Sequence, residues 1–272
     1  MTTSFDHDNP RLAAIYDRLS ESQFQSGKRL VERLELRSGN RVLDIGCGTG
    51  RLAEWIAEIV GPDGNVVGID PLPERVAIAR ARARRASFEI GRAEDLCAFA
   101  AGSFDAVCMS AVFHWVSDKP KALAEVKRVL RSGGRLGVTT LPKELIGAST
   151  VTEVCAPVFS RHPYSERVDL SALALVSRGH TTTELISMVL ASGLELVELS
   201  IRQRTRAIPN GEAVVDFVES SSFGNFLRIV PEELRAPLKA DLANAFEARR
   251  GPEGIAVRNH GTTFVARLSP KD

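Results

Sequence analysis

Short runs of β-branched residues alternate with helical patterns between residues 41 and 141, and this alternation constrains the fold more than any other feature of the sequence. Turn signals separate the segments, such as "GPDGN" at 61–65. Alternation of this kind indicates an α/β fold with a parallel sheet and helices on both faces. We therefore predict strands at 41–45, 65–70, 86–90, 104–110 and 135–141, with helices at 51–60, 73–85 and 119–134.

The remaining segments predict a single domain, 1–272, with additions to this core. Residues 1–37 read as N-terminal helices before a cofactor-binding core at 38–141, and the segments at 142–180 and 209–258 read as cap insertions. Residues 181–208 and 259–268 are predicted to close the sheet, through a capped helix and two strands. A helical pattern at 231–250 contains Pro237, which is expected to interrupt it.

The stretch "RVLDIGCGTG", residues 41–50, places three glycines between a strand and a helix. Glycine lets the backbone approach a ligand without a Cβ atom in the way, and the following helix directs N–H groups at it. Asp70 closes the second strand, where a carboxylate can accept hydrogen bonds from ribose hydroxyls, so the pattern predicts nucleoside recognition. Arg51 stands where a nicotinamide dinucleotide site needs a small residue, which weighs against a dehydrogenase.

The register Asp-x-Gly-x-Gly-x-Gly begins at Asp44, and "VVGIDPLPERVAIAR", "FEIGRAEDL", "FDAVCMSAVFHWV" and "ALAEVKRVLRSGGRLGV" follow it in order. From about residue 38 to 141 the chain resembles the class I S-adenosylmethionine-dependent methyltransferases. It is similar to the small-molecule branch with ubiquinone/menaquinone C-methyltransferases, malonyl-carrier O-methyltransferases and trans-aconitate methyltransferases. The resemblance implies a Rossmann-like, doubly wound seven-stranded sheet with an antiparallel last strand, and S-adenosyl-L-methionine as cofactor.

The resemblance also implies roles by position. Asp44 is expected to order the loop and face the cofactor's ammonium group, and Asp70 to hold the ribose, while Glu94 or Asp95 could accept from the adenine amino group. The family often has Asp or Asn at the position of Arg92. The expected cofactor-binding residues are Asp44, Gly46, Cys47, Gly48, Gly50, Asp70, Pro71, Arg92, Ala93, Glu94 and Ser110, with Tyr16 of the first helix as a lid.

The segment "SAVFHWV" follows the fourth strand, and ligands of doubly wound sheets bind outside the carboxyl ends of strands. His114 is therefore a candidate catalytic base, and the alternative is a structural histidine packed beside Trp115. Trp115 is a candidate substrate residue, since an aromatic face favours a cation such as a sulfonium; the alternative is a tryptophan of the apolar core. Arg161 and Tyr164 are candidate substrate residues in the first cap segment, where an arginine could clamp a carboxylate; the alternative is a solvated loop.

The balance of 35 Lys and Arg against 34 Asp and Glu leaves a net charge of +1, which gives no overall field for nucleic acid or an anionic membrane. The N-terminus lacks the pattern of a signal peptide, and "AVCMSAVFHWV" is about half of the roughly 20 residues that span a bilayer. Four cysteines without a regular framework fit a reducing compartment. We expect a cytoplasmic protein with a small-molecule substrate, without a nucleic-acid or membrane partner.

The predicted reaction is methyl transfer to a small molecule, at oxygen or carbon, with no metal ion. One alternative is arsenite methylation, because thiolates bind soft arsenic and Cys97 and Cys155 are candidate ligands. The other is methylation of a nucleic acid or a protein. Against it, the fourth strand lacks the Asn/Asp-Pro-Pro-aromatic motif of the DNA amino-methyltransferases.

Overall fold

The computed structural model describes residues 8–168 and 179–270. The described residues fall into two compact units. We name the first the helical unit; it comprises residues from 1–20, 141–179 and 201–261. The second, the sheet unit, comprises residues from 21–140, 180–200 and 262–272. Each unit draws on separate stretches of the chain, so neither is a continuous segment.

The strands of the described residues join in the order β3-β2-β1-β4-β5-β8-β6, and a short strand β7 pairs with β8 off this path. Their bounds are β1 (Arg41–Ile45), β2 (Asn65–Asp70), β3 (Ser87–Ile90), β4 (Phe104–Ser110), β5 (Leu130–Thr140), β6 (Glu195–Ile208), β7 (Arg250–Gly251) and β8 (Gly254–Arg267). The pairs from β3 to β5 are parallel, and β8 is antiparallel to β5. The predicted α/β sheet with an antiparallel last strand is confirmed.

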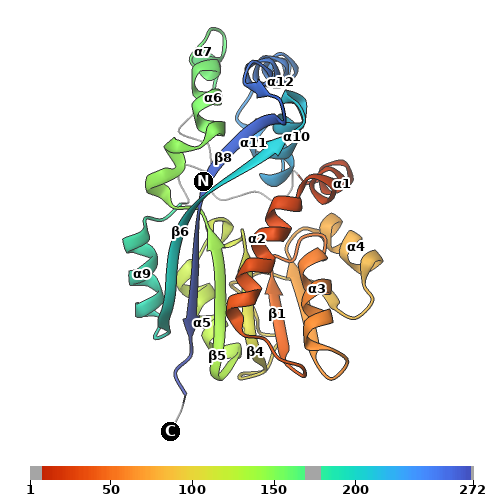
Figure 1. Cartoon of the computed structure of the whole chain (residues 1–272), viewed down its shortest axis with the longest axis vertical. Helices are drawn as coiled ribbons and strands as arrows, with labels where there is room; N and C mark the ends of the chain where they lie inside the picture. Colours follow the sequence, from red (N-terminus) through yellow and green to blue (C-terminus); the bar gives the residue numbers. More distant parts are fainter. Residues whose placement is uncertain (1–7, 169–178, 271–272) are drawn as a thin grey trace. The chain divides into compact units, whose positions relative to one another are not determined.

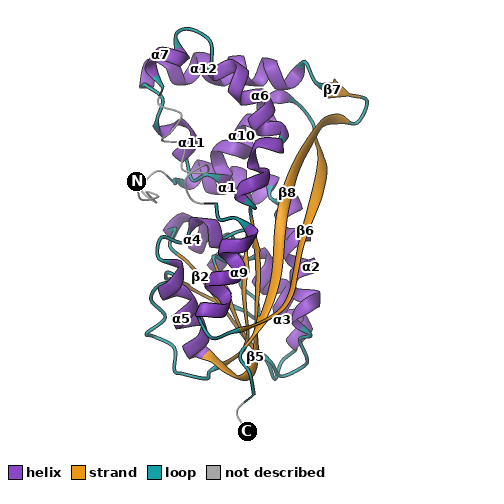
Figure 2. Cartoon of the chain, turned by 90° about the vertical axis from the view of Figure 1, so that its left-hand side faces the viewer, coloured by secondary structure: helices purple, strands orange, loops and turns teal. Residues whose placement is uncertain are grey.

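Helices cover both faces of the sheet in the sheet unit, as Figures 1 and 2 show. Helices α2, α3 and α4 pack on one face, whereas α5 and α9 pack on the other. Their bounds are α2 (Glu21–Val31), α3 (Arg51–Val60), α4 (Pro73–Arg82), α5 (Lys119–Val129) and α9 (Thr182–Ala191). A capping box of Thr181 and Glu184 begins α9, and the 3₁₀ turn η1 (Glu32–Leu34) follows α2.

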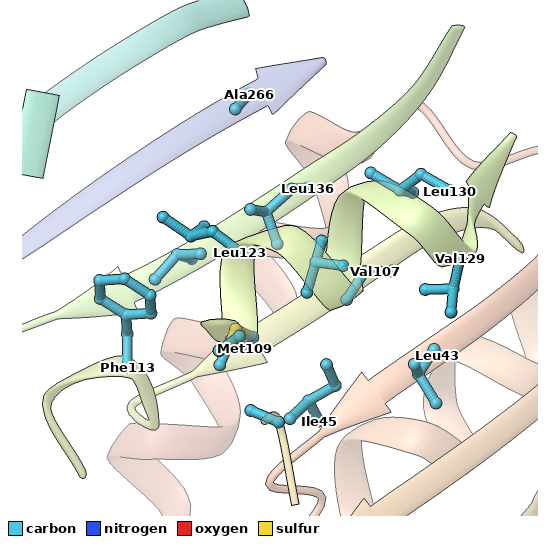
Figure 3. Packing of buried hydrophobic residues seen from close by; sticks show 14 of the residues in the cluster. Leu43, Ile45, Val107, Met109, Phe113, Leu123, Val129, Leu130, Leu136 and Ala266 are labelled. Carbon is cyan, nitrogen blue, oxygen red and sulfur yellow. The ribbon is translucent and has the colours of Figure 1, made fainter. Parts of the chain in front are cut away.

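Alternate residues of the central strands serve the two faces. In β1, Val42 packs in the cluster with α2 to α4, while Leu43 packs in the cluster with α5 and α9. Both side chains are 0% exposed, as expected of a strand covered on both sides. Figure 3 shows the second cluster, in which Leu123 and Val129 of α5 lie over the strands. The resulting rigid sheet fixes the ends of β1, β2, β4 and β5, where the candidate residues lie.

Two boundary predictions were wrong. The helix predicted to run to residue 134 ends at Val129, because β5 begins at Leu130 and "SGG" lies inside this strand. Gly133 has φ +76°, and the pairing with β4 shifts register there, which makes this stretch an irregular edge of the ladder instead of a helix end. Pro237 does not interrupt its helix either, since α12 runs continuously from Glu232 to Glu247. Its buried face, which includes Leu238 and Phe246, stabilises the helix despite the lost N–H donor.

The helical unit has its own apolar core. The buried residues come mainly from α6, α10 and α12 and include Phe159, Val214 and Leu242. The described helices of this unit are α1 (Pro10–Leu19), α6 (Thr150–Phe159), α7 (Tyr164–Arg167), α10 (Gly211–Ser221), α11 (Asn225–Arg228) and α12 (Glu232–Glu247), with the 3₁₀ turn η3 (Lys143–Ala148). None of the described helices in either unit combines the length and the apolar character that a membrane crossing requires.

Candidate active site

The glycine loop joins β1 to α3 and is tied to the neighbouring strand β2. The N–H groups of Gly46 and Cys47 donate to the carbonyl oxygen of Ile69 at 2.7 and 3.0 Å. Gly46 has φ +74° and Gly50 has φ +80°, a region that side-chain-bearing residues rarely occupy. A Cβ atom on Gly46 would lie 2.1 Å from Cγ2 of Val112, so only glycine fits there. The loop therefore presents bare backbone at the carboxyl end of β1.

Asp70 is the last residue of β2, and its carboxylate organises the loop. Oδ2 accepts from the backbone N–H of Gly48 at 2.9 Å, and Oδ1 accepts from the backbone N–H of Leu72 at 2.9 Å. The side chain is buried at 6% exposure. Two bonds to backbone N–H groups fix the plane of this carboxylate. The structure therefore brings Asp70 and the glycine loop together.

Asp44 is buried in β1, beneath the glycine loop. Its Oδ1 accepts from Sγ of Cys108 at 3.2 Å, whereas its Oδ2 has no hydrogen-bond partner among the described residues. Burial raises the pKa of Asp44 from 3.8 to about 7; the bond from Cys108 lowers it and the charge of Asp70 raises it further. A buried carboxylate with an open oxygen is an electrostatic complement to a cation.

The turn after β3 lies beside Asp70, because the N–H of Gly91 donates to the carbonyl oxygen of Asp70 at 3.2 Å. Arg92 is exposed, and Ala93 is buried in the apolar cluster with α5. Glu94 accepts the N–H of Ser117 at 2.8 Å, so its carboxylate fixes the start of α5. Pro71, directly after Asp70, is half-buried. The backbone of this turn is therefore next to Asp70.

Two features restrict the backbone at the end of β4: helix α2 lies close to Ser110, and Ala111 has a positive φ. A Cβ atom on Gly27 of α2 would lie 3.1 Å from Oγ of Ser110, so α2 approaches this strand end closely. The next residue, Ala111, has φ +60°, which is uncommon for a residue other than glycine. Its N–H donates to Oγ1 of Thr139 at 2.8 Å, which holds this conformation. Strained backbone of this kind is concentrated at functional sites.

His114 lies in the 3₁₀ turn η2 (Phe113–Trp115) that follows β4. Its Nδ1 lies 3.4 Å from Oγ1 of Thr140, and its ring centroid lies 5.1 Å from that of Trp115. Both residues are 8% exposed. Burial lowers the pKa of His114 from 6.5 to about 3, and the charge of Lys119 contributes in the same direction. The imidazole is therefore neutral at physiological pH.

Three of the expected site residues belong to the helical unit. Tyr16 is half-buried in α1, and Arg161 is exposed at the end of α6. Tyr164 is buried, and its hydroxyl donates to Oδ2 of Asp241 at 2.7 Å. Burial is the first cause that raises the pKa of Tyr164 to about 12, and the carboxylate of Asp241 adds to it. Their roles in binding stay predictions.

Sequence reasoning missed Thr140, which lies beside His114, and Thr262, its strand partner in β8. Thr140 is the last residue of β5. Doubly wound sheets bind ligands at the carboxyl ends of their strands. The same rule that points to the ends of β1, β2 and β4 also points to Thr140 at the end of β5. No local pattern could have identified its partner in β8, because their proximity depends on long-range strand pairing.

Comparison with known proteins agrees with this geometry. A methyltransferase domain model matches residues 43–138, which hold the glycine loop, Asp70 and His114. The chain is 31% identical over 277 residues to the nocamycin O-methyltransferase of Saccharothrix syringae, covering 96% of this chain and 97% of the relative. It is 33% identical over 138 residues to the demethylmenaquinone methyltransferase of Symbiobacterium thermophilum, covering 48% of this chain and 55% of that protein.

A solved structure shares the fold. It is a SAM-dependent methyltransferase from Aquifex aeolicus, with a TM-score of 0.52 and 19% identity, covering 70% of this chain and 91% of that chain. Together with the match along nearly the whole nocamycin O-methyltransferase, the loop, the buried acids and the sheet order lead to one conclusion. The chain belongs to the class I methyltransferases, and its cofactor is S-adenosyl-L-methionine.

Proposed function

We propose that this methyltransferase transfers the methyl group of S-adenosyl-L-methionine to a small-molecule acceptor, at oxygen or carbon. The observation that carries the proposal is the bond between the Gly48 N–H and the Asp70 carboxylate. This bond holds the glycine loop, which can bind an amino-acid tail, next to a buried acid, which can bind a ribose. A nucleoside with an amino-acid tail needs both. The relative that this chain matches along 97% of its length is named an O-methyltransferase, which supports oxygen as the acceptor atom.

The residues present fit the cofactor. Asp44 has an open, buried Oδ2, and an ammonium group facing it would favour the ionised carboxylate and offset its desolvation. Asp70 is held in place by two backbone N–H groups and can accept from ribose hydroxyls. We assign the methionine part to Gly46, Gly48 and Gly50, with Cys47 and Ser110 beside it.

The adenine end is assigned to the turn next to Asp70. Glu94 already accepts the N–H of Ser117, so the backbone of Arg92 and Ala93 is the better adenine contact. Pro71 would lie against the ribose. Tyr16 stays a proposed lid on the strength of the sequence alone.

The bound cofactor supplies an electrophilic methyl group on a sulfonium. We propose that His114 acts at the acceptor. As the acceptor oxygen forms its bond to the methyl carbon and the carbon–sulfur bond breaks, the hydroxyl proton passes to the imidazole. Because burial lowers the pKa of His114, the imidazole is a weak base, so acceptors with acidic hydroxyls are favoured over simple alcohols.

The acceptor-side assignments in the helical unit rest on the sequence. An arginine at 161 would suit an acceptor carboxylate, with Tyr164 and Trp115 as further substrate residues. Arsenite is less well supported, because burial raises the pKa of Cys155 to about 12, so this thiol resists forming the thiolate that arsenic requires. Nucleic-acid or protein methylation gains no support from a net charge of +1.

Isothermal titration calorimetry with S-adenosyl-L-methionine tests the cofactor site. Wild-type protein is expected to bind, and Asp70→Asn to bind about 10- to 100-fold more weakly, because charged hydrogen bonds to the ribose are worth about 1.5–3 kcal/mol. Glu89→Gln, an exposed acid in β3, is the control and should bind like wild type. Equal affinity for Asp70→Asn and wild type, with both folded by circular dichroism, would contradict the assignment.

A panel of radiolabelled methyl-transfer reactions tests the acceptor class. The panel holds carboxylic acids, phenols, enolised 1,3-dicarbonyl compounds, quinone precursors and arsenite. Transfer to the acidic hydroxyl compounds is expected. Transfer to arsenite alone, or to RNA or protein added in parallel, would refute the proposal.

A further inference from the structure

A polar pair interrupts the apolar face of the sheet where β5 ends. Leu136 and Val138 of β5 pack in the apolar cluster with α5, and so does Phe264 of β8. Alternate residues of a strand share a face, so Thr140 and Thr262 continue this same face. They are direct partners in the antiparallel pairing of β5 with β8. Directly opposed residues have Cβ atoms about 4.5–5.5 Å apart, so the two side chains are neighbours.

The turn η2 brings His114 to this pair. Phe113 packs edge-to-face on Phe264, with ring centroids 6.1 Å apart, which anchors the turn over β8. The neighbouring His114 then places Nδ1 3.4 Å from Oγ1 of Thr140. The imidazole of His114 thus lies against Thr140, and the strand partner of Thr140, Thr262, adds a second hydroxyl to a face that is otherwise apolar.

Thr262 is the unusual member of this group. Its side chain is 0% exposed, and its Oγ1 has no hydrogen-bond partner among the described residues. A buried hydroxyl without a partner lowers the free energy of unfolding, and valine has nearly the same shape without that cost. In native proteins each such group calls for an explanation, and a role at a functional site is one. The open oxygen of Thr262 therefore points to a ligand that supplies the missing bond.

We propose that Thr140 is a positioning residue that holds the proton of His114 on Nδ1, and that Thr262 hydrogen-bonds an oxygen of the methyl acceptor. With Nδ1–H donated to Oγ1 of Thr140, Nε2 is left as the nitrogen that accepts the acceptor's proton. The class of acceptor follows from the pair. It presents two neighbouring oxygens, one methylated and one bound by Thr262, as in a carboxylic acid or an enolised 1,3-dicarbonyl compound. This inference rests on the proposed function.

Long-range ¹H–¹⁵N NMR of histidine-labelled protein tests Thr140 without any acceptor. His114→Gln assigns the signal among the five histidines. The Nδ1–H tautomer is expected in wild type and in Thr140→Ser, which keeps the hydroxyl. In Thr140→Val a mixture of tautomers is expected. An Nε2–H tautomer in wild type, or an unchanged spectrum in Thr140→Val, would overturn the assignment of Thr140 while leaving cofactor binding untouched.

Thr262→Val tests the second residue by two measurements. Thermal unfolding should shift upward by about 2–4 °C, because the variant removes a buried hydroxyl that lacks a partner. KM for the acceptor found in the panel should rise about 10-fold with kcat little changed, since one hydrogen bond is lost. Thr262→Ser keeps the hydroxyl and should retain the KM, and Thr263→Val, on the opposite face of β8, should retain both kcat and KM.

The two proposals can fail separately. A lowered unfolding temperature for Thr262→Val would make Thr262 structural and refute its role, whether or not an acceptor is known. An unchanged KM would refute it as well. If no compound in the panel is methylated, the proposed function fails, while the tautomer and unfolding measurements still decide the inference.

Discussion

Asp44 shows how one residue can hold a site ready for a cation. The carboxyl group is buried under the glycine loop with one oxygen bonded to Cys108 and the other open. Burial costs more for the charged form than for the neutral one, which is why its pKa rises to about 7. The folded chain keeps this acid at a cost in stability, which a positively charged ligand would offset.

The free energy of unfolding should record that cost as a function of pH. The folded pKa of about 7 lies above the ordinary value of 3.8, so the unfolded chain loses this proton first. The contribution of Asp44 is therefore fully present below pH 3.8 and is lost as pH rises to about 7. Asp44→Asn has no carboxyl group to titrate, so its free energy of unfolding does not decrease in this way. Between pH 3.8 and pH 7 it should therefore gain about 2–4 kcal/mol relative to wild type.

Urea unfolding at pH 5 and pH 8 measures this difference. Asp63→Asn, in an exposed turn, is the control and should follow wild type at both values. A stability difference between Asp44→Asn and wild type that does not change with pH would show that Asp44 is ionised in the folded protein throughout.

The loop between β1 and α3 depends on glycine for two separate reasons. Gly46 combines a positive φ of +74° with the side chain of Val112 where its Cβ would lie. Gly39 lies outside this loop, in the turn before β1, and offers a comparison. It has φ +83°, and no atom lies within 4 Å of the position that its Cβ would take. An alanine at Gly46 would meet both backbone strain and a steric clash, whereas an alanine at Gly39 would meet backbone strain alone.

Gly46→Ala is expected to lower the free energy of unfolding by about 2 kcal/mol or more, and Gly39→Ala by about 1 kcal/mol from φ alone. Val112→Ala should recover part of the loss in the Gly46→Ala background, because it removes the clashing methyl groups. Urea unfolding of the four proteins checks this. Equal losses at both glycines would mean that Val112 moves aside freely.

The strands and this loop could be predicted from the sequence because their signals are local. The runs at β1 and β2 are rich in β-branched residues, the run at β4 is largely apolar, and the glycines of the loop come directly before a helix. The end of α5 was misplaced because "SGG" has the composition of a helix cap and yet lies in the irregular first part of β5. The pairing of Thr140 with Thr262 could not be predicted, since it depends on the register of two strands far apart in the sequence.

At the scale of the whole molecule, positive and negative residues nearly cancel. Arginines of the basic run "ARARARR", residues 79–85, bond to the protein's own backbone. Arg80 donates to the carbonyl oxygen of Phe88 at 2.9 Å, and Arg82 donates to that of Thr49. Guanidinium groups bonded to the protein's own backbone are poorly placed to contact phosphates. With a net charge of +1 and these arginines bonded to backbone, α4 does not provide a concentrated basic patch for nucleic acid.

Fluorescence anisotropy with labelled single-stranded RNA and duplex DNA at 50 mM salt is expected to give no saturable binding below about 100 μM, the strong end of non-specific affinities being micromolar. A basic protein of similar size serves as the positive control. Saturable binding that weakens steeply with salt would revive a nucleic-acid substrate.

The strand order has a consequence for synthesis. Of the described strands, β8 leaves the ribosome after all the others, yet it lies between β5 and β6, and β6 has no other neighbour in the order of described strands. Until β8 emerges, β6 has no strand to pair with, and the edge of β5 that faces β8 is unpaired as well. Translation of β8, and not of the glycine loop, sets the moment at which the sheet closes.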